Sequence, residues 1–276
     1  MRPTHLFLLA LFAGCGTPAT VESDPEVVSL DIEAVAASDA AREWFDRVVR
    51  VFGMEIYAAP ETPEAKLLHA AAVAAEYIDN NEDGAADDPL VAASLAAERA
   101  TLVMFATFDD LENSTLFEGS WVDGRVGQDL AAEETNRPGG FDASLEEVLH
   151  LVHNAGHAQV YPSQFGMEGP SALTEAMDLA RGGHFDQVPV NYPQEAWFHY
   201  DDVTCDYACM ATEYAYWAQT SLLGAQASRC AEIAVEWELC TPEQVRTGDP
   251  AVTRLLTETV AAPMTVLPDG VYPNTP

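Results

Sequence analysis

The chain has 276 residues, and 48% of them are hydrophobic, which is enough apolar material for the packed core of one medium-sized domain. It carries 45 acidic and 12 basic residues, so its formal net charge is −33, and Lys66 is the only lysine. Proteins that bind nucleic acids need a basic face, so we expect no nucleic acid as a partner. An acidic surface suits a salty exterior and divalent cations.

The N-terminus has the three parts of an export signal: a weakly basic start, an apolar run at 6–13 and small residues before Cys15. The apolar run is too short to span a bilayer of ~30 Å. Residues 12–15 resemble the lipobox of bacterial lipoproteins, although Phe12 stands where leucine is usual. The resemblance implies a signal peptide at 1–14, a lipid on Cys15 and a polar tether at 15–27. It places the protein on the exported side of the bacterial cell envelope, bound to the membrane through the lipid. An ordinary cleaved signal is the alternative.

Residues 28–276 are expected to form a single α+β domain, because strand patterns come early and helical patterns dominate later. In the first part, 28–142, we predict one strand at 48–58, bent at Gly53, and another at 101–108. A helix capped by Thr62 runs to residue 78, and a second covers 89–99. The stretch 113–142 is loop-like, with a short strand around Trp121. In the second part, 143–276, the predicted helices cover 144–156, 171–181, 206–223, 231–239 and 242–257.

An acidic loop at 79–88 lies between two of these helices. Asp79, Asn81, Asp83 and Asp87 stand at positions 1, 3, 5 and 9 of an EF-hand-type loop, with Gly84 at the sharp turn and the Ala85 carbonyl at position 7. The loop resembles EF-hand and dockerin loops, but Leu90 replaces the acid at position 12. The resemblance implies a structural Ca²⁺ site, and a solvated acidic turn is the alternative.

The helix predicted at 144–156 and the residue after it carry three histidines within eight residues. At about 100° per residue, Glu146, His150, His153 and His157 fall on one side, and an apolar stripe falls on another. Imidazole nitrogen and carboxylate oxygen are zinc ligands, so Glu146, His150 and His153 are candidates for a Zn²⁺ or other transition-metal site. The preferred ligand from elsewhere is Glu213, and the further candidates are His184, His199 and Tyr200.

The run Glu146-Glu147-Val148-Leu149-His150 resembles the His-Glu-x-x-His helix of zincin metallopeptidases, with glutamate in place of the first histidine. The resemblance implies that Glu146, His150 and Glu213 hold the metal and that Glu147 is the general base in peptide hydrolysis. The alternative is structural. Ser144 and Glu147 also match a capping box, in which Glu147 would only support the start of the helix.

Four cysteines remain beside Cys15: Cys205, Cys209, Cys230 and Cys240. An even number in an exported chain predicts two disulfides, and the sequence leaves three pairings open. We favour Cys205–Cys209 and Cys230–Cys240, because each closes a short loop around a helix end. A zinc site at the Cys-x3-Cys pair is the alternative.

Together these patterns predict an envelope-anchored metal-binding protein with a structural calcium site and a zinc-dependent hydrolase activity on peptides. The alternative is a non-catalytic, calcium-stabilised surface lipoprotein that serves as a binding scaffold.

Overall fold

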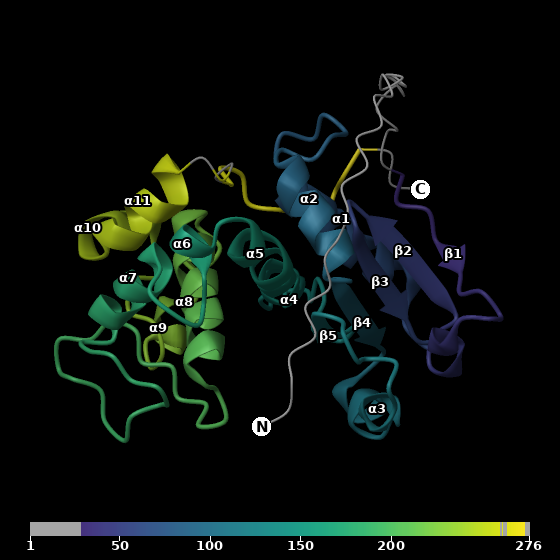
Figure 1. Ribbon diagram of the computed structural model, residues 1–276, viewed down its shortest axis with the longest axis horizontal. Helices are drawn as coiled ribbons and strands as arrows, with labels where there is room; N and C mark the ends of the chain where they lie inside the picture. The colour runs from purple at the N-terminus through teal and green to yellow at the C-terminus, as the bar shows by residue number, and fades with distance from the viewer. Residues whose placement is uncertain (1–28, 260, 262–263, 274–276) are drawn as a thin grey trace, which may run out of the picture.

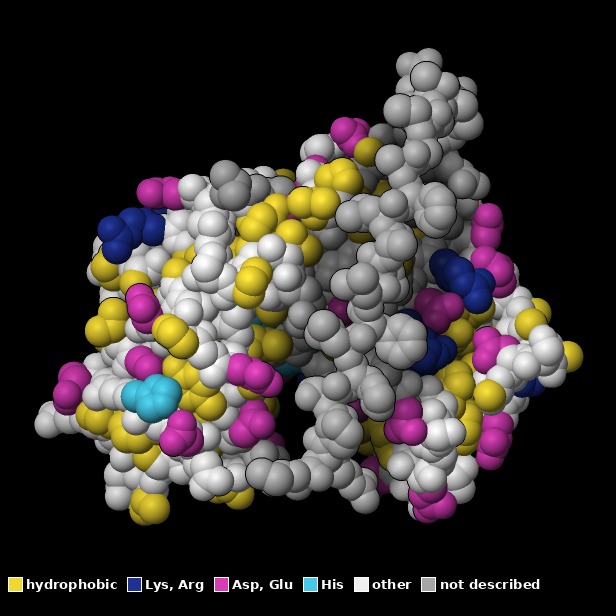
Figure 2. Space-filling model, viewed as in Figure 1, with side chains coloured by type: hydrophobic (Ala, Val, Ile, Leu, Met, Phe, Trp, Pro, Cys, Tyr) yellow, Lys and Arg dark blue, Asp and Glu magenta, His cyan; other side chains and the backbone are white. Residues whose placement is uncertain are grey.

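The computed structural model describes residues 29–259, 261 and 264–273, and it confirms the α+β fold. A five-stranded sheet forms in the first half of the chain, and helices are the main secondary structure of the second half (Figure 1). Cys15 and the predicted lipobox lie outside the described residues. Among the described helices, none is both long and apolar enough to cross a membrane. Acidic side chains are scattered over the face shown in Figure 2, where basic side chains are few.

The sheet has the order β1-β2-β3-β4-β5. Its strands are Glu33–Ala34, Arg47–Val51, Met54–Ala58, Thr101–Phe105 and Gly127–Ala131. The pairs β1–β2 and β2–β3 are antiparallel, whereas β3–β4 and β4–β5 are parallel.

The prediction of one bent strand at 48–58 is wrong, because β2 and β3 form a hairpin. Phe52 and Gly53 make its turn with φ of +43° and +91°, the left-handed conformation that two-residue hairpin turns favour. A Cβ atom on Gly53 would lie 2.6 Å from the Ala92 carbonyl oxygen, so the turn also needs glycine for close packing.

The strand expected around Trp121 is also misplaced, since the edge strand is β5, Gly127–Ala131. Only the last two residues of this strand, Leu130 and Ala131, are buried. A half-exposed edge strand lacks the apolar run that marks β4, so its sequence pattern is weak.

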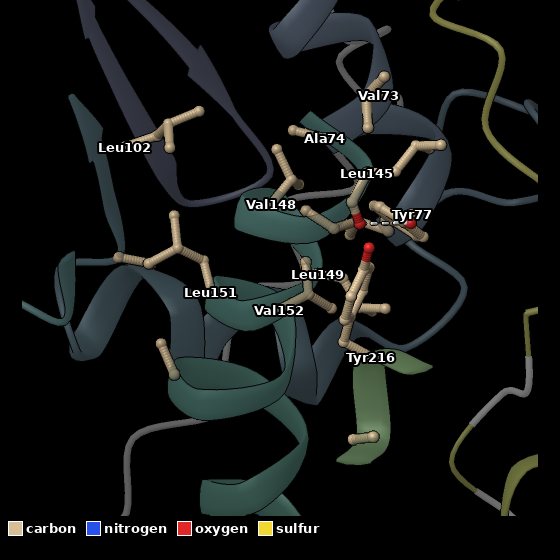
Figure 3. Packing of buried hydrophobic residues seen from close by; sticks show 14 of the residues in the cluster. Val73, Ala74, Tyr77, Leu102, Leu145, Val148, Leu149, Leu151, Val152 and Tyr216 are labelled. Carbon is tan, nitrogen blue, oxygen red and sulfur yellow. Dashed lines mark hydrogen bonds between the residues drawn. The ribbon is translucent and has the colours of Figure 1, made fainter. Parts of the chain in front are cut away.

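Helices α1 (Glu64–Ile78) and α4 (Ser144–Leu151) pack against one face of the sheet, and α2 (Pro89–Ala97) lies beside them. Thr62 does not cap α1: the helix starts after Pro63, and the Thr62 hydroxyl donates to the Met104 carbonyl at 3.0 Å. Figure 3 shows the core between α1 and α4, where Leu145, Val148 and Leu149 meet Val73 and Tyr77. The ligand-bearing helix is therefore held by its apolar side.

The second face of the sheet carries a separate apolar cluster that includes Phe45, Tyr57, Phe105 and Leu116. It is covered by the short segments η1 (Ala40–Glu43), α3 (Phe108–Glu112) and η2 (Leu116–Glu118). Trp121 packs at the border of this cluster, and the centroids of the Trp121 and Tyr57 rings are 5.2 Å apart.

In the second half, α8 (Tyr207–Leu222) is almost entirely buried and lies among the shorter helices. These are α5 (Ala158–Val160), α6 (Pro162–Phe165), α7 (Ala172–Ala180), α9 (Cys230–Ile233), α10 (Pro242–Gly248) and α11 (Pro250–Glu258). The helix predicted at 242–257 is interrupted at Asp249, whose carboxylate caps α11 and accepts hydrogen bonds from Trp197 and Tyr214. The disulfides Cys205–Cys209 and Cys230–Cys240 are confirmed.

Candidate metal centre

Helix α4 presents its polar side to the helical half of the molecule. Leu145, Val148 and Leu149 are buried in the core, whereas Glu146 and Glu147 are partly exposed and His150 is buried. The residue before the helix is Ala143, so the predicted capping box between Ser144 and Glu147 is wrong. The Ser144 N–H and hydroxyl instead donate to Asp142, at 3.2 and 2.7 Å. Glu147 therefore has no role in capping.

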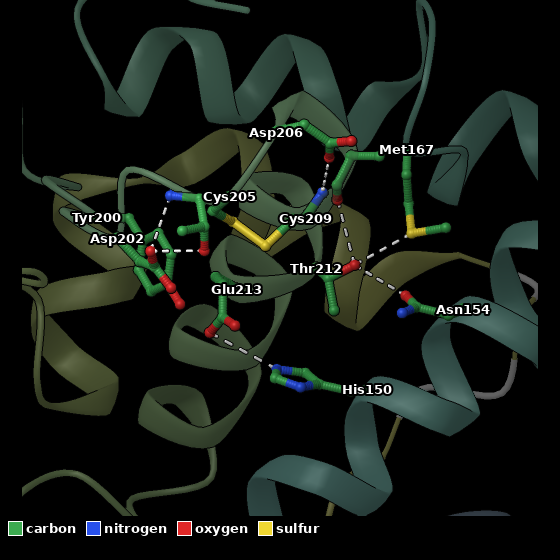
Figure 4. Close-up of a disulfide and its surroundings, with 12 residues drawn as sticks. His150, Asn154, Met167, Tyr200, Asp202, Cys205, Asp206, Cys209, Thr212 and Glu213 are labelled. Atoms are coloured by element: carbon green, nitrogen blue, oxygen red, sulfur yellow. Dashed lines mark hydrogen bonds and ion pairs between the residues drawn. A yellow bond between two sulfur atoms is a disulfide. The ribbon is translucent and has the colours of Figure 1, made fainter. Parts of the chain in front are cut away.

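The structure brings together three of the predicted metal ligands. One ligand atom each from Glu146, His150 and Glu213 lies within 4.8 Å of the other two, and within the described part of the chain no other residues form such a group of three. Nε2 of His150 lies 3.6 Å from Oε2 of Glu213 (Figure 4), which is too long for a hydrogen bond. Both atoms are buried and have no hydrogen-bond partner. Buried polar atoms are rarely left unsatisfied, so a water molecule or a cation between these two atoms would satisfy both.

Helix α8 holds Glu213 opposite α4. Asp206 caps the start of the helix, and its carboxylate accepts the Cys209 N–H at 2.9 Å. One residue before Glu213, the Thr212 hydroxyl donates to the Asn154 side chain at 2.8 Å and so ties α8 to the segment after α4 (Figure 4). Glu213 itself is 8% exposed, so its carboxylate is held in place by surrounding protein.

Each of the three ligand residues has one further side chain that orients it. Nε2 of Gln128 lies 2.9 Å from Nδ1 of His150, the Tyr216 hydroxyl hydrogen-bonds to Glu146, and the Tyr200 hydroxyl hydrogen-bonds to Glu213. Metal-binding histidines usually donate their second ring N–H to such a partner. A metal on Nε2 of His150 would require that Nδ1 carries the proton. The Gln128 side-chain amide, rotated by 180°, would then place its oxygen at Nδ1 and accept that N–H.

Burial sets the electrostatics of the site. Loss of solvent raises the pKa of Glu146 and of Glu213 to about 7, and the positive charge of a protonated His150 opposes both shifts. Burial, with the charges of Asp129 and Glu134, raises the pKa of Glu147 to about 8. A bound cation would favour the ionised carboxylates that burial disfavours.

His153 does not join the three candidate ligands, although His150, His153 and His157 line one small cavity. Residues Val152–His157 form a π-helix, whose i→i+5 hydrogen bonds change the direction of the side chains that follow His150. His153 and His157 instead pack on Phe165, with ring centroids at 6.0 and 5.4 Å. Burial lowers the pKa of His153 to about 3, so its ring stays neutral beside a cavity of about 30 Å³. Gly156 continues this helix and does not end it.

Of the further ligand candidates, only Tyr200 reaches the site, as the hydrogen-bond partner of Glu213. His184 is exposed and pairs with Asp178 at 2.8 Å and with Asp186 at 3.2 Å. Nε2 of His199 lies 2.8 Å from the Ala196 carbonyl oxygen. Gln128 and Tyr216 are absent from the sequence-based site, because neither residue type is a usual zinc ligand and β5 is not predicted.

A cleft of about 750 Å³ reaches the site, and Glu146 and Glu147 lie in its wall. Phe141 and Arg229 form another part of the wall, with the guanidinium carbon 4.3 Å from the Phe141 ring centroid. Pockets of this size commonly hold substrates. Of the three candidate ligands only Glu146 lines this cleft, whereas Nε2 of His150 and Oε2 of Glu213 are buried.

The predicted calcium loop is organised by hydrogen bonds around Asp79. This residue is fully buried, and its carboxylate accepts the N–H groups of Asp83 (3.1 Å) and Gly84 (2.8 Å) and the Tyr272 hydroxyl. The Asp83 carboxylate accepts the Ala85 N–H, and the Asp87 carboxylate accepts the Asn80 N–H and the Asn81 amide. These bonds account for the fold of the loop, so calcium binding stays a prediction.

Comparisons with known protein families, with characterised proteins and with solved structures gave no match. The functional interpretation therefore depends on the geometry and chemistry of the described residues.

Proposed function

We propose that the protein is a metal-dependent hydrolase of peptides, with Glu146, His150 and Glu213 as ligands of a zinc-type ion. The main support is the pair of unsatisfied buried atoms, Nε2 of His150 and Oε2 of Glu213, which lie 3.6 Å apart. Glu146 adds a third ligand from the same helix as His150. Catalytic zinc sites use three such protein ligands and keep one position open for water or substrate.

The ion would acidify a bound water, and the chain would supply the group that takes its proton. Glu147 is the proposed base. Its carboxylate lies in the cleft wall beside Glu146, and its pKa of about 8 lets it exchange a proton near neutral pH. Oε2 of Glu147 is 3.7 Å from Nδ1 of His150, so the proposed base and a proposed ligand are neighbours on α4.

Removal and return of the metal test this function. The full chain, purified with its disulfides intact, is treated with a chelator and then titrated with zinc against a coloured competitor. We expect one tight equivalent of zinc, and cleavage of a mixed peptide pool that is absent in chelator and restored by zinc, as read by mass spectrometry. Zinc binding without any cleavage would overturn the hydrolase, and absence of zinc binding would overturn the metal site as well.

We further propose that the domain works on the exported side of the envelope, anchored through a lipid on Cys15. The two disulfides support this location, because disulfides persist in oxidising compartments and are rare in the cytosol. In the native host, a palmitate analogue is expected to label the wild-type chain and not the Cys15→Ser variant. Equal labelling of the two, or none of either, would contradict the lipid anchor.

A further inference from the structure

A second pocket, separate from the metal cleft, lies on the other face of the sheet. Its volume is about 170 Å³, and it lies where β4 and β5 begin, at Thr101 and Gly127. The segment from Leu116 to Arg125 forms its outer wall.

Gly127 keeps this pocket open above the edge strand. A Cβ atom on Gly127 would contact only the Thr101 carbonyl oxygen, at 3.7 Å, so a larger residue could occupy this position without a clash with the backbone. The absence of a side chain leaves space beside Val103, Leu116 and Trp121. Phe117 also lines the pocket although its side chain is 62% exposed. An exposed phenylalanine at a pocket is a common feature of ligand sites.

The size and walls of the pocket fit a flat apolar ring. A protein cavity of ~150 Å³ lined by apolar side chains is known to hold benzene. Here the walls include two aromatic side chains, Phe117 and Trp121, and aromatic rings pack well against each other at offset or edge contacts. The pocket therefore favours an aromatic group over a long charged one.

Two N–H groups of the lining residues favour a ring that carries oxygen. Nε1 of Trp121 and Nε of Arg125 are buried and have no hydrogen-bond acceptor. The guanidinium is fixed, because Nη1 donates to Glu55 and Thr101, both at 2.9 Å, and its carbon lies 4.3 Å from the Trp121 ring centroid. A buried donor without an acceptor costs free energy, so a ligand with an acceptor oxygen would be stabilised by hydrogen bonds from these two N–H groups.

We propose that this pocket is a binding site for a phenolic ring, and, resting on the proposed peptide hydrolysis, that the ring is a tyrosine side chain of the peptide. Binding of the ring itself needs no metal, but one residue links the pocket to the candidate metal centre. Gln128 lines the pocket, and its amide lies 2.9 Å from Nδ1 of His150. A peptide held by its tyrosine in the pocket would thus lie against the strand that orients a metal ligand.

The test uses 4-methylphenol as the probe and toluene as the same ring without oxygen, each titrated into the metal-free full chain by calorimetry. We expect saturable binding of one 4-methylphenol, at least about fivefold tighter than toluene, which is the effect of one hydrogen bond. Gly127→Val is expected to weaken both probes at least tenfold by filling the pocket. Gly169→Val, at a position with no neighbouring atoms within 4 Å, is the matched control and should bind like the wild type.

Two further variants keep the test independent of any folding defect in β5. Phe117→Ala removes an exposed side chain and should weaken both probes severalfold. Trp121→Phe removes the indole N–H and should reduce the preference for 4-methylphenol over toluene. Absence of saturable binding, or binding that Gly127→Val and Phe117→Ala leave unchanged, would overturn the pocket. Equal affinity of the wild type for both probes would overturn its preference for phenols.

Discussion

Replacing His150 with alanine is expected to remove tightly bound zinc from the protein. His150 supplies the only nitrogen ligand of the proposed centre, and its Nε2 faces Oε2 of Glu213 without another partner. We expect the zinc affinity to fall by roughly 100-fold or more, because even side chains that only orient a metal ligand change it by about 10- to 100-fold. The measurement is zinc content after dialysis, with competition titration for the affinity.

His184→Ala is the control for this experiment. His184 is exposed, pairs with Asp178 and Asp186, and does not belong to α4 or α8. This variant should keep the wild-type zinc content. Gln128→Ala should give an intermediate loss, because it removes the partner of Nδ1 and leaves all three ligands in place. If His150→Ala and His184→Ala retain the same zinc, the metal site assigned to Glu146, His150 and Glu213 is wrong.

Replacing Glu147 with glutamine is expected to abolish peptide hydrolysis while zinc remains bound. Glutamine has nearly the same shape but cannot accept the proton of a water molecule, and general-base catalysis contributes roughly 10²- to 10⁴-fold. We therefore expect the cleavage rate to fall by about that factor and the zinc content to stay at the wild-type level. Both are measured on the same zinc-loaded sample.

The same variant should be more stable than the wild type at alkaline pH when zinc is removed. The pKa of Glu147 is about 8 in the folded chain and near its ordinary value of 4.5 when unfolded. Between these values the folded state holds a proton that the unfolded state has released, so the stability of the wild type falls as the pH rises through this window. Glutamine does not titrate, so Glu147→Gln should gain on the order of 4 kcal/mol at pH 8 and nothing near pH 4.

Glu61→Gln is the matched control, because it removes one negative charge from an exposed residue that makes no side-chain hydrogen bond. It should change neither the cleavage rate nor the stability of the fold appreciably. A gain in stability with loss of activity is the pattern of a residue kept for function. A Glu147→Gln variant that cleaves peptides at the wild-type rate would remove Glu147 from the proposed chemistry.

The residues of the candidate metal centre could be predicted from sequence where a single helix or a strong motif carried the information. Glu146 and His150 are four residues apart and so lie one turn apart on α4, whose apolar stripe fixes the direction of the helix. Glu213 is the preferred ligand from elsewhere in the sequence, the resemblance to zincins implies it as well, and α8 does bring it to His150. The disulfide pairing followed from the short loops that it closes.

Other parts of the site depend on tertiary structure and left little trace in the sequence. The change to π-helical geometry after Leu151 carries no residue signature, so the sequence does not show that His153 stays outside the group of three ligand atoms. Gln128 lies on a half-exposed edge strand, and its contact with His150 spans 22 positions in the chain. The Ser144 N–H and hydroxyl donate to Asp142, whereas a capping box would have Glu147 accept the Ser144 N–H.

The placement of the ligands on α4 and α8 has a mechanical consequence. Helix α4 belongs to the packing of the sheet, whereas α8 is the central element of the helical half. An ion between them would join the two halves as a cross-link and close a loop of roughly 60 residues, which restricts the unfolded chain as a covalent staple does. The helical half would then come apart from the sheet more readily once the ion was withdrawn.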